Sequence, residues 1–153
     1  MIINRILEKN LTLCQAPVNS KKRVLENIAE LIHQCNSNID AEDLFKLLTA
    51  RERLGSTAIG HGIAIPHCRS GQVTTTIGCL VTLKNPIGFD SHDDLPVDII
   101  FALVVPENAT DEHLNTLAEL AELLEQSSFR NRLRQAKTSE ELYNAATHFE
   151  KAA

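Results

Sequence analysis

The sequence predicts an α/β fold, a three-layer α/β/α sandwich in which a mixed central sheet has helices on both faces. Helical and strand patterns alternate along the chain without a linker or a low-complexity block. The run from 97 to 105 is apolar at every position except Asp98, as in a central strand covered by helices on both sides. A chain of 153 residues with 43% hydrophobic residues can bury one core, so residues 1–153 are expected to form a single domain.

In the first third of the chain, a short strand is expected over 11–16. Ser20 then precedes a helix, because apolar residues recur at helical spacing at Val24, Ile28, Leu31, Ile32 and Cys35. Asp40 can cap a second helix, which Gly55 ends. The inward side of that second helix is expected to carry Leu44, Leu47 and Leu48.

The rest of the chain alternates between extended and helical segments. Strands are expected over 63–65, 75–83 and 97–105. A helix opens near Thr110, with one apolar face made by Leu114, Leu117, Ala118, Ala121 and Leu124. A short helix over 129–133 follows. The last helix begins at Thr138, where the segment up to Glu141 fits a capping box.

Charge and composition exclude several classes of partner. The net charge is −5 and no basic run is present, which argues against nucleic acid and against anionic membrane surfaces. No segment has the roughly 20 apolar residues that a membrane-spanning helix needs, and the N-terminus shows no signal-peptide pattern. The scattered cysteines form no Cys-x-x-Cys pair. These features favour a cytoplasmic protein.

The segment from Arg51 to His67 is the strongest chemical signal in the chain. It is rich in glycine and ends in Pro66-His67. Glycine allows a backbone to approach a bound anion, and proline fixes the direction of the histidine that follows. A neutral imidazole can attack phosphorus directly. We therefore expect His67 to carry a phosphoryl group beside a phosphate-binding loop formed by Gly55, Ser56, Thr57, Gly60 and Gly62.

Two more residues can support such a group. Arg51 precedes the glycine-rich segment by one helical turn, and its guanidinium can hold phosphate oxygens. His113 lies in the predicted first turn of a helix, where an anion is favoured and an imidazole N–H can donate. Taken alone, an arginine placed like Arg51 is usually just a solvent-exposed side chain, and His113 fits a tolerated surface residue in a first helical turn. His33, His92 and His148 have no such context and are assigned no role.

Taken together, the residues from Gly55 to His67 resemble the active-site signature of fructose/mannitol-type EIIA domains. These domains belong to the bacterial phosphoenolpyruvate-dependent phosphotransferase system. The resemblance extends to Ser20–Arg23, to Pro96–Leu103 and to His113–Leu117, and so covers nearly the whole chain as one EIIA type-2 domain. It is greatest to the nitrogen-regulatory branch of the family.

The resemblance implies roles for three residues. His67 stands at the phosphorylated histidine, His113 at the second active-site histidine and Arg51 at the arginine that stabilises the phosphorylated state. It implies an enzyme of the phosphotransferase type that uses no cofactor and no metal. The chain departs from the family pattern at Ala58, His61 and Cys68, where glycine, asparagine and glycine are usual.

The resemblance also implies partners. The donor would be an HPr-like phosphocarrier, docking against apolar residues for which Ala58, Ile59 and Ile63 are candidates. In the nitrogen-regulatory branch the phosphorylation state controls binding to potassium-transport or sensor-kinase proteins. The alternative within the family is a sugar-specific EIIA that passes phosphate to an EIIB for fructose or mannitol uptake.

Other classes explain the sequence less well. A metal enzyme using His61, His67, Cys68 and His113 lacks a standard ligand spacing. A P-loop enzyme is disfavoured because no Lys-Ser/Thr follows the glycines. A purely structural interaction domain with an unused site stays open, and it predicts that replacing His67 changes neither phosphorylation nor partner affinity.

Overall fold

The structure is a computed structural model, and it describes residues 1–149, without the side chains of Glu112 and His113. Helices and strands follow one another in a largely alternating order. The helices are α1 Ile2–Ile6, α2 Lys21–Cys35, α3 Ala41–Leu54, α4 Asp111–Leu124, α5 Ser127–Gln135 and α6 Ser139–Thr147. The strands are β1 Leu7–Ala16, β2 Ala58–Gly60, β3 Ile63–Ala64, β4 His67–Ser70, β5 Ile77–Ile87 and β6 Val97–Pro106.

Strand β6 is the centre of a mixed, six-stranded sheet with the order β1-β5-β6-β3-β2. One edge of β6 pairs antiparallel with β5, and β1 extends the sheet by pairing parallel with β5. The other edge pairs parallel first with β3 and then with β4. Most side chains of β6 are buried, as the apolar run from 97 to 105 predicts.

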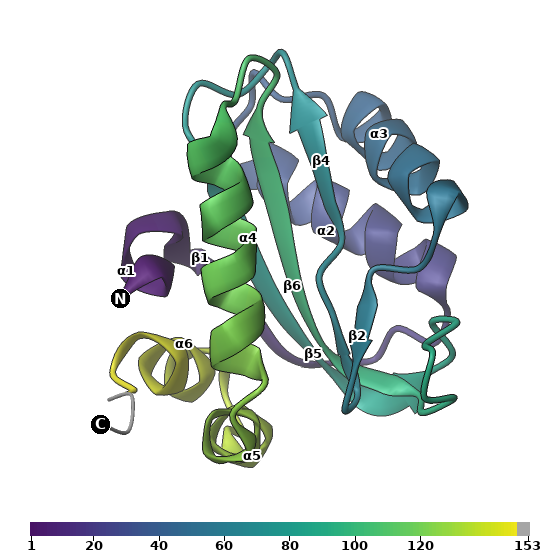
Figure 1. The fold of residues 1–153 in the computed structure, drawn as a ribbon, viewed down its shortest axis with the longest axis vertical. Helices are drawn as coiled ribbons and strands as arrows, with labels where there is room; N and C mark the ends of the chain where they lie inside the picture. Colours follow the sequence, from purple (N-terminus) through teal and green to yellow (C-terminus); the bar gives the residue numbers. More distant parts are fainter. Residues whose placement is uncertain (150–153) are drawn as a thin grey trace.

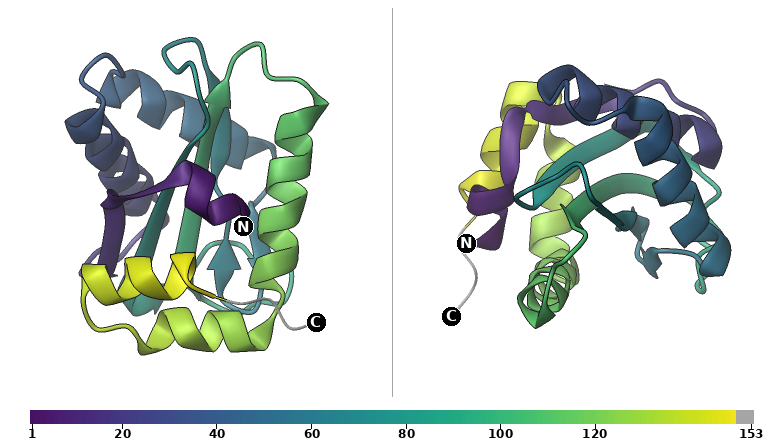
Figure 2. Two further views of the ribbon diagram at one scale, coloured as in Figure 1. Left: turned by 90° about the vertical axis from the view of Figure 1, so that its left-hand side faces the viewer. Right: turned by 90° about the horizontal axis from the view of Figure 1, so that it is seen from above.

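Helices cover both faces of the sheet, which confirms the predicted three-layer sandwich (Figure 1). Helices α2 and α3 pack on one face, where Ile28, Ile32 and Leu48 share a core with the sheet. Helices α1, α4, α5 and α6 cover the other face, where Leu120 and Phe129 belong to a second core. The view from above in Figure 2 shows the sheet between these two helical layers.

Three predicted helix starts, at Ser20, Asp40 and Thr138, are confirmed by capping hydrogen bonds, while Thr110 precedes α4 without one. The Ser20 hydroxyl accepts from the amide of Arg23, and the Asp40 carboxylate accepts from the amide of Asp43. Thr138 accepts from the Glu141 amide at 3.1 Å. The Glu141 carboxylate accepts from the amide of Lys137, one residue before the position that a full capping box uses.

The ends of the strands differ from the predictions. The chain begins with the short helix α1, and β1 starts at Leu7, four residues before the predicted strand. The predicted strand at 63–65 is part of a longer region in which β2, β3 and β4 follow one another with only short breaks. Strand β5 continues to Ile87, beyond the predicted end at 83.

The apolar face predicted for α4 is partly wrong. Leu124 is buried, but so are Leu120 and Leu123, while Leu114 is 60% exposed. In α3, Leu44 and Leu48 are buried as predicted, but Leu47 is 39% exposed. Both exposed leucines lie beside His67, as described below. Among the described residues, no helix is long and apolar enough to cross a membrane.

Candidate functional site

His67 is the first residue of β4, immediately after a break in the strand edge. Below the break, β3 pairs with β6 at Ile63 and Ala64; above it, His67 pairs with Leu103. At the break, the carbonyl of Pro66 accepts from the Leu103 amide, which leaves the Ile65 carbonyl outside the ladder with β6. That carbonyl lies 2.7 Å from Nδ1 of His67.

This contact fixes the tautomer of the imidazole. A carbonyl oxygen only accepts, so Nδ1 of His67 must carry the proton and donate it to Ile65. In the neutral ring the lone pair therefore lies on Nε2. Burial lowers the pKa of His67 below its ordinary value of 6.5, and the positive charge of Arg51 lowers it further, against the opposing effects of the Ile65 hydrogen bond and the charge of Glu52. His67 is thus a neutral base with an available Nε2 near pH 7.

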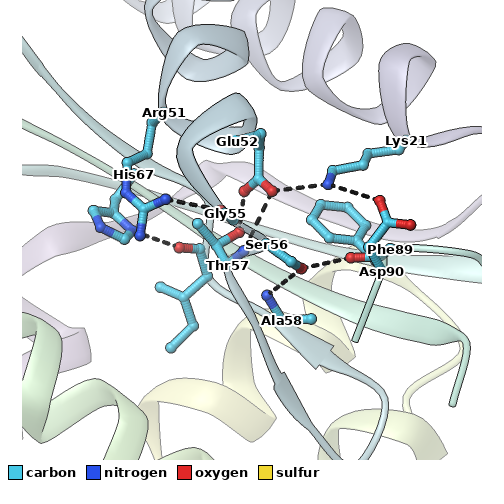
Figure 3. A network of polar contacts seen from close by, with 11 residues as sticks. Lys21, Arg51, Glu52, Gly55, Ser56, Thr57, Ala58, His67, Phe89 and Asp90 are labelled. Atoms are coloured by element: carbon cyan, nitrogen blue, oxygen red, sulfur yellow. Dashed lines mark hydrogen bonds and ion pairs between the residues drawn. The ribbon is translucent and has the colours of Figure 1, made fainter. Parts of the chain in front are cut away.

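Arg51 lies beside His67 in the last turn of α3 (Figure 3). Its Nη1 donates to the carbonyl of Gly55 at 2.9 Å, so the chain just beyond the helix holds the guanidinium in place. The other N–H groups of an arginine fork remain able to bind anionic oxygens. Arg51 and His67 are brought together as the sequence predicts.

Glu52, next to Arg51, is a buried carboxylate that the sequence reasoning missed. It accepts from both the amide and the hydroxyl of Thr57, and it forms an ion pair with Lys21 at 3.0 Å. Lys21 also reaches Asp90 at 3.5 Å and lies over the ring of Phe89 (Figure 3). In the sequence, Glu52 follows Arg51 near the end of a helix, a pattern typical of two solvent-exposed charged residues. The burial of Glu52 and its contacts with Thr57 and Lys21 can be seen only in the structure.

The segment from Gly55 to Ala58 uses its polar groups mainly to hold its own shape. The amide and the hydroxyl of Thr57 both donate to Glu52. The Ser56 hydroxyl donates to the Phe89 carbonyl at 2.5 Å and accepts from the amide of Ala58. The structure therefore places Gly55, Ser56 and Thr57 next to Arg51, but the donors of Thr57 are already engaged with the carboxylate.

Gly60 and Gly62 lie elsewhere, in the hairpin between β2 and β3. Gly60, His61 and Gly62 all have positive φ, of 93°, 58° and 80°, as tight hairpin turns require. The Gly62 carbonyl accepts from the amides of Asp98 and Ile99, while His67 pairs with Leu103. Four residues along β6 correspond to about 13 Å. The structure does not bring these two glycines to His67.

A largely apolar pocket of about 490 Å³ opens over His67. Exposed leucines form part of its wall: Leu54 is 85% exposed, Leu114 60% and Leu47 39%. We call Leu47, Leu54 and Leu114 the leucine rim. Of the residues expected to form a docking surface, Ile63 is fully buried and cannot contribute, because it points into the core between the sheet and α4.

Arg69 is a second cation at the pocket that the sequence reasoning missed. It lies two residues after His67 on β4, and alternate residues of a strand share a face. Its Nη1 donates to the carbonyls of Glu107 and Ala109, in the connection that leads into α4. The backbone of His113 belongs to the first turn of α4, and its side chain lies outside the described part of the structure.

The metal-enzyme alternative requires His61 to lie near His67 and Cys68, and the fold places it elsewhere. His61 lies on the β2–β3 hairpin, where its ring is 3.8 Å from the Glu125 carboxylate. Burial raises the pKa of the Cys68 thiol to about 12, so this residue is a protonated thiol at neutral pH. Among the residues whose side chains are described, no three histidine, cysteine or acidic side chains cluster as metal ligands.

Comparison with known proteins shows the family to which the chain is similar over almost its whole length. Residues 5–148 match the family described as "Phosphoenolpyruvate-dependent sugar phosphotransferase system, EIIA 2". A nitrogen regulatory protein of Pseudomonas aeruginosa is 46% identical over 141 residues, covering 92% of each chain. One of Escherichia coli is 40% identical over 149 residues, covering 97% of this chain and 91% of the relative.

A solved structure gives the same result. The crystal structure of the nitrogen regulatory protein IIA-Ntr from Neisseria meningitidis has a TM-score of 0.88 and 40% identity, covering 96% of this chain and 100% of that one. Family match, relatives and structure all span almost the full length of the chain. The chain therefore belongs to the EIIA 2 family of the phosphoenolpyruvate-dependent sugar phosphotransferase system.

Proposed function

We propose that this protein is a phosphohistidine carrier that accepts a phosphoryl group on Nε2 of His67 from an HPr-like protein. The observation that carries the proposal is the 2.7 Å hydrogen bond from Nδ1 of His67 to the Ile65 carbonyl. It keeps the proton on Nδ1 and leaves the lone pair on Nε2, in a ring whose lowered pKa keeps it neutral. A phosphotransferase-system family and a pocket open to a protein partner support the same reading.

The transfer is an in-line displacement at phosphorus. Nε2 of His67 forms the new N–P bond as the donor's N–P bond breaks, and the electron pair of that bond returns to the donor's ring nitrogen. A donor phosphohistidine protonated on its second nitrogen leaves as a neutral imidazole. The proton on Nδ1 of His67 stays in place, and the Ile65 carbonyl stabilises the positive charge that the ring gains.

The role of the surrounding residues is mainly electrostatic. Phosphoryl transfer depends on positioning and on stabilising the charge of the equatorial oxygens. Arg51 has N–H groups beyond the one bound to Gly55 and can direct them to these oxygens. We assign the same supporting role to His113 and give Arg69 a place at the edge of the site. The reaction as proposed uses no metal and no cofactor.

The leucine rim is the proposed docking surface for the donor and for later partners. Exposed apolar side chains around a reactive group are typical of interaction sites rather than of inert surface. Because relatives at 40–46% identity are nitrogen regulatory proteins, we propose a regulatory output, in which the phosphorylation state controls binding to potassium-transport or sensor-kinase proteins. The proposed compartment is the cytoplasm.

The test is intact mass after incubation with phosphoenolpyruvate, enzyme I and an HPr-type carrier. The natural protein should gain one acid-labile phosphoryl group, and His67→Ala should gain none. His33→Ala is the matched control, because Nδ1 of His33 also lies 2.7 Å from a carbonyl, that of Ile39, outside this pocket. Phosphorylation of His67→Ala, or no mass gain in the natural protein, would refute the proposal.

A second experiment separates the regulatory role from sugar uptake, since the family description names sugar transport. The phosphorylated protein is mixed with fructose- or mannitol-type EIIB domains, and the loss of its phosphoryl group is followed. A regulatory protein keeps its phosphoryl group under these conditions. Rapid, sugar-dependent loss would instead identify a sugar-specific EIIA.

A further inference from the structure

Glu52 is a charged side chain in a place where charge is unfavourable. Its side chain is only 4% exposed, and its partner Lys21 is 23% exposed. Replacing a buried ion pair with apolar residues often leaves a protein equally or more stable. The carboxylate is therefore not explained by stability alone. Its contacts show what it holds in place.

The carboxylate holds the turn that follows α3 from the buried side. Both donors of Thr57 are directed to it, from the amide and from the hydroxyl. Two residues earlier, the Gly55 carbonyl accepts from Nη1 of Arg51. At one end of the turn Thr57 is hydrogen-bonded to Glu52, and at the other end Gly55 is hydrogen-bonded to Arg51. Arg51 itself lies beside His67 (Figure 3).

A third anchor ties the same turn to the loop before β6. The Ser56 hydroxyl donates to the Phe89 carbonyl, and Lys21, the ion-pair partner of Glu52, lies over the Phe89 ring at 4.6 Å. Rotation of the turn would break the Thr57 and Ser56 contacts together. The Gly55 carbonyl, and with it the guanidinium of Arg51, has therefore one preferred position.

We propose that Glu52 is a positioning residue for phosphoryl transfer: through Thr57 and the turn that begins at Gly55, it sets where Arg51 stands beside His67. This inference rests on the proposed function, since it assigns a role within the same site. Glu52 has a second, direct effect, because its negative charge opposes that of Arg51 at the imidazole. Both effects can be measured separately.

The charge is tested with Glu52→Gln, which removes the negative charge and keeps only one of the two oxygens that accept from Thr57. The pKa of His67, followed by NMR titration of its ring protons, should fall, because Glu52 raises it in the natural protein. Transfer from the phosphorylated carrier at saturating carrier concentration should slow by about tenfold. The matched control is Glu26→Gln, a glutamate of α2 paired with Arg23 at 3.8 Å, which should change neither quantity.

The geometry is tested with Thr57→Val, which has the shape of threonine without the hydroxyl donor. It keeps the charge of Glu52, so the pKa of His67 should not fall. Transfer should nevertheless slow, and Thr57→Ser, which restores a hydroxyl, should recover the natural rate. If Glu52→Gln does not fold, Thr57→Val and Thr57→Ser together still test whether the turn positions Arg51 for transfer.

Two results would overturn the inference. One is an unchanged His67 pKa together with a natural transfer rate in folded Glu52→Gln. The other is a natural transfer rate in Thr57→Val. If the natural protein accepts no phosphoryl group at all, the proposed function fails, and the NMR titration still reports whether Glu52 acts on His67. The two failures are therefore distinguishable.

Discussion

His67 and Ile65 are joined across Pro66 by a hydrogen bond of 2.7 Å between the imidazole Nδ1 and the backbone carbonyl. Since this bond keeps the proton on Nδ1, the phosphoryl group should be found on Nε2. Nitrogen-15 and phosphorus-31 NMR of the phosphorylated, ring-labelled protein distinguishes the two isomers. A signal from a phosphoryl group on Nδ1 would show that the Ile65 contact breaks before transfer.

The lowered pKa of His67 predicts how transfer depends on pH. The neutral ring is the nucleophile, and more than half of the rings are neutral at pH 6.5, so the rate should still exceed half its maximum there and should decline further at lower pH. The measurement is the single-turnover rate from a phosphorylated carrier between pH 5 and 8. A rate that is already halved at pH 7 would contradict the effect of burial.

The same shift predicts a contribution to stability. Because the folded-state pKa lies below 6.5, the unfolded chain binds a proton more readily than the folded chain does. The contribution of His67 to the free energy of unfolding should therefore rise with pH through 6.5 and level off above it, where the unfolded ring has also lost its proton. Denaturant unfolding of the natural protein and of His67→Gln, compared between pH 5 and 8, measures this. A difference that does not vary with pH would contradict the prediction.

The leucine rim can be tested at Leu54, which is 85% exposed. Leu54→Ser should change the free energy of unfolding by less than about 0.5 kcal/mol, because an exposed side chain loses little packing. The KM for the carrier should rise several-fold, since central interface residues contribute about 1 kcal/mol or more. Leu95→Ser is the control, because Leu95 is 51% exposed but lies beside the β2–β3 hairpin. A KM for the carrier that is the same in Leu54→Ser as in the natural protein would exclude the leucine rim as the docking site.

Gly62 should be intolerant of a side chain. Its φ is 80°, and a Cβ would lie 2.6 Å from Nη2 of Arg134 and 2.9 Å from Oδ1 of Asp98. Gly62→Ala should therefore destabilise the fold by about 1–3 kcal/mol. Gly88→Ala is the control, since nothing lies within 4 Å of its Cβ position, and thermal unfolding compares the two. Folded Gly62→Ala should transfer the phosphoryl group at the natural rate. Slow transfer would instead support the prediction that Gly62 belongs to the phosphate-binding loop.

Arg51→Lys tests the need for a fork of donors. A single ammonium has no planar pair of N–H groups with which to bind Gly55 and the phosphoryl oxygens together. The variant should keep its stability within about 0.5 kcal/mol but should transfer about tenfold more slowly. Single-turnover kinetics measures this. Arg53→Lys, on the same helix turn but outside the residues that line the pocket, is the control.

Much of the fold could be predicted because its signals are local. The caps at Ser20, Asp40 and Thr138 are side-chain hydrogen bonds within four residues, and the apolar run of β6 needs no partner to be recognised. The face of α4 was less predictable. Its leucines are spaced so that two overlapping faces are equally apolar, and only packing against the sheet selects Leu120 and Leu123.

The site likewise contains residues that could be predicted from the sequence and residues that could not. His67 and Arg51 follow from residue type and spacing, and the fold brings them together. Glu52 and Arg69 could not be predicted, because their partners are backbone groups and side chains fixed only by tertiary structure. The glycines at 60 and 62 were expected at the phosphate because they are close to His67 in sequence. A strand rises about 3.3 Å per residue, so closeness in sequence along a strand is not closeness in space.

The break in the strand edge at Pro66 has a consequence for how this sequence can evolve. Below it, β3 pairs with β6, and the hairpin between β2 and β3 contacts Asp93, Asp98 and Arg134. Above it, Nδ1 of the imidazole is held by the Ile65 carbonyl, and the Ile65 amide donates to the Thr57 carbonyl. The half-exposed side chain of His61 in this hairpin can therefore be replaced without turning the ring, whereas Gly62 cannot accept a Cβ.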